Sequence, residues 1–138
     1  MLAQIIQAEV SHNDFVGHIG GDDFIVLFAT TDGSAAAQRI CQQFSQRMTN
    51  YYLAEHLAAG GFYATDRLGA PCFFPLLSLS IGLANPDTTL CSSHHDVAAL
   101  ASDAKQQAKK SAGTTVFVNK RRVPAHLAKA SIAASLSG

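Results

Sequence analysis

The sequence predicts an α+β fold in which a mostly antiparallel central sheet is flanked by helices. Two observations support this class. Segments with apolar residues at helical spacing alternate with short β-branched and aromatic runs, and these runs come in pairs joined by glycine-rich turns. With 138 residues the chain is long enough for one domain with its own core, or for part of one, and too short for two of ordinary size.

The first half of the chain predicts a helix, a hairpin and a second helix. Residues 2 to about 11 form the first helix, because their apolar side chains recur three or four positions apart. Runs at 15–16 and 24–28 then flank Gly20-Gly21-Asp22, a pattern typical of a β-hairpin. A long helix is expected over 35–58, where apolar residues fall four apart.

The second half predicts two further strands, a helix and a final strand. An extra hairpin is expected at about 60–75, and an apolar, central strand follows over about 76–83. Residues 92–113 read as a helix that a glycine closes, and 115–118 as the last strand. The order of elements, α-β-β-α-β-β-α-β, favours hairpins over repeated crossovers. Residues 123–138 are an Ala/Ser-rich tail or linker, which leaves 1–122 as the domain.

Composition excludes several classes of function. Ten basic residues balance ten acidic ones, and the one short basic run is NKRR at 119–122, so neither nucleic acid nor a membrane is an expected partner. The first ten residues resemble neither a signal peptide nor a membrane span, so a cytoplasmic protein is expected. Three widely spaced cysteines predict buried thiols rather than disulfides or a metal site.

The chemistry of this chain is expected at the tip of its first hairpin. In one interpretation Gly20 and Gly21 supply the positive φ angles of a tight turn, while Asp22 and Asp23 face solvent. In the other, the glycines let a phosphate chain approach the backbone, and a carboxylate beside them holds Mg²⁺. The two interpretations are compatible.

Four segments, in the right order, resemble the GGDEF domain of bacterial diguanylate cyclases. The segment GGDDF at 20–24 resembles the family signature, with Asp in place of Glu at its fourth position. The residues at 14–16 resemble the strand that leads into the signature, and SLSIGLA at 78–84 resembles a later strand of the family. The family's last helix and strand resemble ASDAKQQAKKSAGTTVFV at 101–118. The hairpin at 60–75 is similar to an insertion found in some of these domains. The resemblance implies a nucleotidyl-cyclase-like fold.

The resemblance also implies roles for particular residues. In the family, two facing domains each hold one GTP and join the two nucleotides into cyclic di-GMP, a reaction that depends on positioning and on metal ions. Gly20 and Gly21 would bind the phosphates, Asp22 would be the Mg²⁺ ligand and catalytic carboxylate, and Asp23 would support catalysis. Lys109, of the Ala108-Lys109 pair, would contact the terminal phosphates.

The chain also departs from the family pattern. The arginine that usually precedes the signature is His18, and the arginine expected near 112–114 is absent. The inhibitory-site motif R-x-x-D reads Ser-His-Asn-Asp, so Asp14 is the part of that site that remains. Residues 1–138 contain no D-x-D-x-F-K metal motif, and the chain resembles the later part of the domain, without the family's first strand and helix.

These departures predict a regulatory or GTP-binding module that is catalytically inactive or impaired. The alternative is part of an active diguanylate cyclase, a nucleotidyltransferase. A third, unrelated reading is a ferredoxin-like binding domain whose Gly-Gly-Asp-Asp segment is merely a turn. Because an incomplete sheet exposes strand edges, a homodimer is expected. A neighbouring sensor or phosphodiesterase-type domain is the expected further partner.

Overall fold

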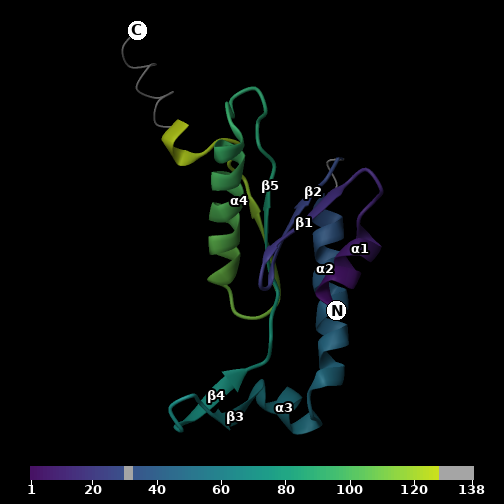
Figure 1. The fold of residues 1–138 in the computed structure, drawn as a ribbon, viewed down its shortest axis with the longest axis vertical. Helices are drawn as coiled ribbons and strands as arrows, with labels where there is room; N and C mark the ends of the chain where they lie inside the picture. The colour runs from purple at the N-terminus through teal and green to yellow at the C-terminus, as the bar shows by residue number, and fades with distance from the viewer. Residues whose placement is uncertain (30–32, 128–138) are drawn as a thin grey trace. The chain divides into compact units, whose positions relative to one another are not determined.

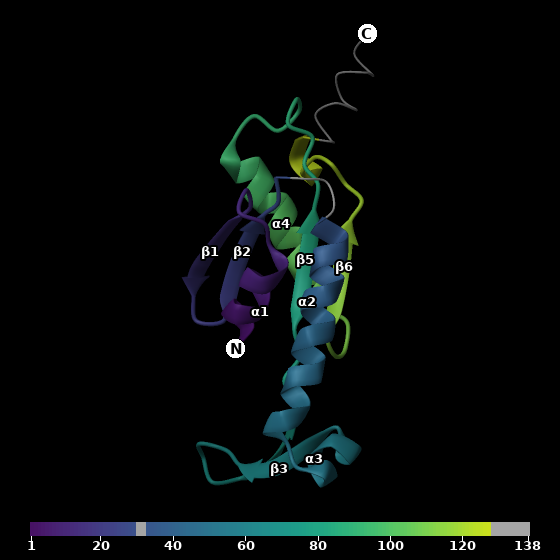
Figure 2. The same ribbon diagram turned by 90° about the vertical axis from the view of Figure 1, so that its right-hand side faces the viewer.

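The computed structural model describes residues 1–29 and 33–127, which belong to two compact units, Met1–Leu79 and Ser80–Gly138. Figure 1 labels the α-helices and strands of both units except β6, which is labelled in Figure 2. The first unit contains α1 (Leu2–Glu9), β1 (Phe15–Gly20), β2 (Asp23–Leu27), α2 (Gly33–Met48), the short 3-10 helix η1 (Thr49–Tyr51), α3 (Ala54–Ala59), β3 (Gly61–Thr65) and β4 (Pro71–Pro75). The second contains β5 (Ser80–Ala84), α4 (His94–Lys109) and β6 (Thr115–Asn119).

The core of the first unit lies between α1 and α2, which run close together in Figures 1 and 2. Ile5 is fully buried, and Ile40 and Phe44 are 3% and 7% exposed. Each such side chain contributes about 1.5–3 kcal/mol by leaving water. At the edge of this core Arg39 Nε donates to Glu9 Oε2 at 2.6 Å, which ties the two helices together.

The long helix expected over 35–58 is wrong, because the chain leaves the helical path after Met48. η1 follows, and then Tyr52 and Leu53 are extended, with φ of −123° and −70° and ψ of 147° and 155°. The hydroxyl of Tyr52 accepts a hydrogen bond from the Leu77 amide at 3.0 Å, and its ring lies 6.3 Å from that of Phe62. These tertiary contacts override the four-residue apolar spacing.

β3 and β4 form an antiparallel hairpin within the residues where the extra hairpin is expected. α3 ends at Gly60, whose φ of 72° is a left-handed cap. The turn is closed by Asp66, whose Oδ1 accepts hydrogen bonds from the amides of Leu68 and Ala70 at 2.8 and 2.9 Å. The turn between β3 and β4 is therefore held by a side chain that mimics a backbone acceptor.

The second unit is a β-α-β arrangement in which α4 packs against the β5–β6 pair. The pair is parallel, and its register aligns Gly82 with Phe117. Leu100 and Ala104 on α4 are fully buried. A Cβ on Gly82 would overlap the α4 backbone at Ala104 and Lys105, so this glycine allows strand and helix to approach closely.

The α+β class is confirmed, whereas the single central sheet is not found among residues 1–29 and 33–127. Their strands form three two-stranded sheets, of which β1–β2 and β3–β4 are antiparallel and β5–β6 is parallel. The parallel pair follows from the chain path, because a helical crossover between two strands returns the chain in the same direction. The central strand expected over about 76–83 is instead β5, which begins at Ser80 and has one hydrogen-bonded neighbour.

Two further expectations can be compared with the structure. Cys41 is buried, and burial raises the pKa of its thiol, but Cys72 is exposed and Cys91 half-buried, so buried thiols are correct for one of the three. Within the described part of the chain, no helix is both long and apolar enough to cross a membrane. Of the tail expected over 123–138, residues 128–138 lie outside the described residues.

Candidate functional site

The Gly-Gly-Asp-Asp segment forms the tip of the β1–β2 hairpin. Gly20 pairs with Asp23 across the hairpin, so Gly21 and Asp22 form the two-residue turn. Gly20 and Gly21 have φ of 147° and 57°, which is the positive-φ role that the turn interpretation assigns to them. A Cβ at either glycine would meet no atom within 4 Å, so the backbone here faces open space.

The two aspartates of the segment differ in their surroundings. Asp22 is exposed at the turn itself. Asp23 is the first residue of β2 and is half-buried. The two carboxylates are therefore not equivalent, and Asp22 is the more accessible to an ion or ligand that approaches the open side of the glycines.

His18, which stands where the family has arginine, contacts the turn. Its Nε2 donates to the carbonyl of Gly21 at 2.9 Å, and its ring stacks on Phe24 with 4.6 Å between centroids and 13° between planes. The imidazole thus spans β1 and β2 and stabilises the turn. This role of His18 cannot be predicted from neighbouring residues, because it depends on the cross-strand pairing of His18 with Phe24.

Asp14 lies at the base of the same hairpin. Its two carboxylate oxygens accept hydrogen bonds from the amides of Ala29 and Ser11, both at 2.8 Å. These two bonds, the one from Ala29 first, hold the pKa of Asp14 below its usual value. Asp14 therefore joins Ser11, in the loop before β1, to Ala29, which follows β2. Its role in a feedback site stays a prediction.

Lys109 is an exposed residue in the last turn of α4. It belongs to the second unit, whereas Gly20, Gly21, Asp22 and Asp23 belong to the first. Its side chain is near the negative end of the helix dipole, which is a favourable place for a lysine without any ligand. The role in phosphate contact therefore still depends on the resemblance.

The hairpin tip can be tested for its fit to Mg²⁺. Mg²⁺ prefers oxygen ligands and commonly takes one or two carboxylates together with substrate phosphates. Asp22 supplies one accessible carboxylate, and no atom lies within 4 Å of the place where a Cβ would stand on Gly20 or Gly21. Among the described residues, no group of three or more His, Cys, Asp or Glu side chains could hold a metal ion. Asp22 thus offers one of the oxygen ligands that Mg²⁺ can use.

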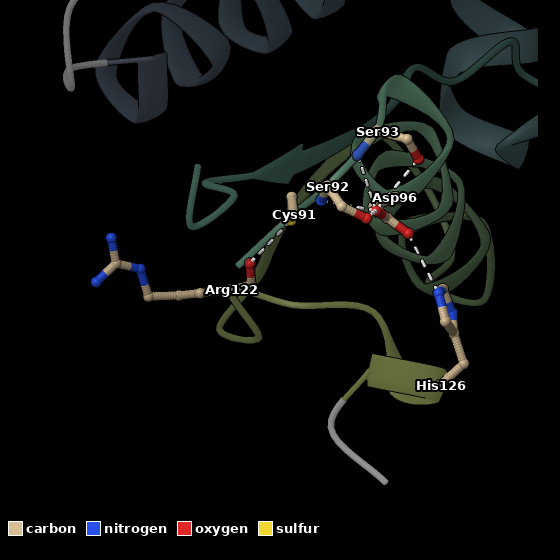
Figure 3. A network of polar contacts seen from close by, with 6 residues as sticks. All are labelled: Cys91, Ser92, Ser93, Asp96, Arg122 and His126. Carbon is tan, nitrogen blue, oxygen red and sulfur yellow. Dashed lines mark hydrogen bonds and ion pairs between the residues drawn. The ribbon is translucent and has the colours of Figure 1, made fainter. Parts of the chain in front are cut away.

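A second polar cluster lies at the N-terminus of α4 (Figure 3). Ser93 is the N-cap, and together with Asp96 three positions later it forms a capping box. Asp96 Oδ2 accepts hydrogen bonds from the amides of Ser92 and Ser93 at 2.9 and 3.0 Å and from their hydroxyls at 3.1 and 3.2 Å. Asp96 Oδ1 lies 3.2 Å from His126 Nε2.

Sequence reasoning placed the start of this helix at Ser92-Ser93 but missed the role of Asp96. The spacing Ser-x-x-Asp at 93–96 is the local signal that could have found the capping box. His126 is 30 residues further along the chain, and no local spacing links it to Asp96. This contact arises from the path of the chain after β6.

Among the residues that the structure describes, Gly20, Gly21 and Asp22 form an open polar turn, and the groups around Asp96 form a closed polar cluster. The carboxylate of Asp22 is exposed at the open turn, whereas that of Asp96 is satisfied by hydrogen bonds within the cluster. No protein-family model, curated protein or solved structure matches this chain.

Proposed function

We propose that this chain is a GGDEF-like module of bacterial cyclic di-GMP signalling that binds GTP and regulates a neighbouring domain. The observation that carries the proposal is the geometry of the hairpin tip. Two consecutive glycines at positive φ face open space beside an exposed aspartate. A phosphate chain can approach such a backbone without meeting side chains.

The division of roles at the tip follows from the same geometry. Gly20 and Gly21 admit the phosphates, and Asp22 provides a carboxylate for the Mg²⁺ that accompanies them. Mg²⁺, when bound, neutralises phosphate charge. His18 holds the turn through the Gly21 carbonyl, so the approach path is preformed. Lys109 is assigned to the terminal phosphates by resemblance.

Catalysis by residues 1–138 alone is not part of the proposal. Positioning of the reacting groups can supply about 7–11 kcal/mol of barrier reduction. The sequence lacks the family's second metal motif, so part of that positioning is missing. A missing arginine alone would cost roughly 10²–10³ in rate. Binding places weaker demands on the site than catalysis does, because it does not require two reacting groups to be aligned.

The second candidate is part of an active diguanylate cyclase. Asp22 favours it, because this residue keeps the carboxylate of the catalytic position at an accessible place in the turn. In that case a homodimer would bring two such tips together, and the product would be cyclic di-GMP.

One experiment tests the proposal and separates the two candidates. GTP binding to the purified chain is measured by calorimetry with and without Mg²⁺, and cyclic di-GMP is quantified by chromatography. We expect Mg²⁺-dependent binding that weakens about tenfold or more in Asp22→Ala, since hydrogen bonds and ion contacts of charged groups contribute roughly 1.5–3 kcal/mol. Asp103→Ala, an exposed aspartate on α4, serves as the matched control and should bind like the wild type.

The outcomes have distinct meanings. If the wild type does not bind GTP, or if Asp22→Ala binds equally well, the proposed site is wrong. If cyclic di-GMP is formed by the wild type and not by Asp22→Ala, the active cyclase is the correct candidate.

A further inference from the structure

Residues 120–127, which we call the strap, follow β6 and return to the start of α4. The carbonyl of Arg122 accepts hydrogen bonds from the Asp87 amide at 2.8 Å and from Cys91 Sγ at 3.7 Å. Pro124 is buried, and His126 contacts Asp96. The strap is thus held at two places, one through its backbone and one through a side chain (Figure 3).

The side-chain attachment ends on an oriented carboxylate. The side chain of Asp96 is 8% exposed, and that of His126 is 63% exposed. The four hydrogen bonds from Ser92 and Ser93 all end on Asp96 Oδ2, so the other oxygen is left directed toward the imidazole. The position of Asp96 is therefore fixed by the α4 cap and does not depend on the strap.

The charge of Asp96 is stable across the neutral pH range. Burial raises its pKa, but the hydrogen bonds from Ser92 and Ser93 outweigh this effect, and the net pKa lies below the ordinary aspartate value. The carboxylate is thus ionised at every pH at which a histidine ordinarily changes charge. The strength of the contact then depends on the proton of the imidazole.

Of the charged groups near His126, Asp96 is the one that determines the strength of the contact. The positive end of the α4 dipole disfavours an imidazolium, and Asp96 offsets that effect. His94 and His95 follow the cap on α4 and lie against each other, with 3.9 Å between ring centroids. The Arg122 side chain extends away from His126 in Figure 3, and Asp87 interacts with Thr89 and Arg122.

We propose that the strap is pH-dependent: an ion pair between Asp96 and protonated His126 closes residues 120–127 on the start of α4, and deprotonation loosens them. A neutral imidazole can still donate one hydrogen bond, but a charge-assisted bond is about twice as strong. The chain that follows β6 is therefore held more firmly in mild acid than at slightly alkaline pH. This inference uses the second unit alone and is independent of the proposed function.

Amide hydrogen exchange in the full chain tests the proposal. The reporter is the amide of Leu127, which donates to the Pro124 carbonyl at 3.1 Å inside the strap. After correction for intrinsic exchange, we expect its protection to be about two- to fivefold greater near pH 5.5 than near pH 7.5, as fits a partly exposed ion pair.

Three variants make the test specific. His126→Gln keeps a donor but cannot titrate, and Asp96→Asn removes the charge, so both should lose the pH-dependent ratio. His95→Gln removes a neighbouring histidine and should keep it. Equal protection at the two pH values in the wild type, or a ratio retained in His126→Gln, would overturn the proposal.

Discussion

Two of the glycine-containing segments that resemble GGDEF domains, GGDDF and SIGLA, use their glycines in opposite ways. In GGDDF, Gly20 and Gly21 face open space and adopt positive φ angles. In SIGLA, Gly82 lies in a strand, and a Cβ there would overlap the backbone of α4. The first pair of glycines is needed for conformation, and the second glycine for packing.

The difference separates a turn that is open on one side from a strand that is packed against a helix. Open space outside a turn can receive another molecule, whereas space that a helix already fills cannot. The two kinds of glycine therefore place different demands on any side chain that replaces them. Substitutions at Gly82, Gly21 and Asp14 measure that division.

Gly82→Ala should destabilise the protein most. The atoms that its Cβ would meet are backbone atoms of Ala104 and Lys105, which cannot rotate away as a side chain could. Overpacking of this kind typically costs about 1–3 kcal/mol, and we expect the upper end of that range. Urea unfolding measures the loss, with Ser80→Ala in the same strand as control.

The control variant, Ser80→Ala, shortens a side chain two positions away in β5 and, unlike Gly82→Ala, adds no atom toward α4. Its unfolding midpoint should stay close to that of the wild type. A Gly82→Ala protein as stable as Ser80→Ala would show that β5 and α4 are not in close contact.

Local structure near strong turn signals could be predicted from the sequence, and pairing between distant segments could not. The hairpin at Gly20-Gly21 is visible because its turn residues and flanking β-branched runs are consecutive. The parallel β5–β6 pair joins segments separated by α4, and apolar periodicity carries no information about strand direction. The helix break after Met48 was missed because Tyr52 keeps the apolar spacing but packs against Phe62.

The candidate site divides in the same way. The positions of Gly20, Gly21 and Asp22 in the turn follow from their neighbours in the chain. The contact of His18 with Gly21, and that of Asp96 with His126, depend on cross-strand register and on the path after β6. Identity of the residues predicts which chemistry is available, while tertiary geometry determines which groups are already engaged.

Gly21→Ala should have a smaller effect than Gly82→Ala. Its Cβ meets no atom within 4 Å, so the cost is that of a left-handed conformation, roughly 1–2 kcal/mol. Gly21→Asn should cost less than Gly21→Ala, because asparagine tolerates this region better. Unfolding midpoints of the three proteins test the order. Equal loss in both variants would mean that the space, and not the φ angle, is restricted.

The smallest effect concerns Asp14, at the closed base of the hairpin whose tip is open. Since its hydrogen bonds from Ala29 and Ser11 lower its pKa from the ordinary value of 3.8, its ionised form stabilises the folded state. This contribution is complete above the ordinary value and is lost as pH falls through the lower, folded value. Asp14→Asn should therefore lower the urea midpoint at pH 7 and lose most of that difference near pH 2.

The neighbouring residue provides the control for this titration. Asn13→Ser changes the same exposed loop without removing a titratable group, so any midpoint difference from the wild type should not vary with pH. If Asp14→Asn behaves in the same way, the carboxylate does not close the hairpin base. If its difference disappears in acid as expected, the base of the hairpin is fixed by charge, and the open tip can be studied as a site on a rigid support.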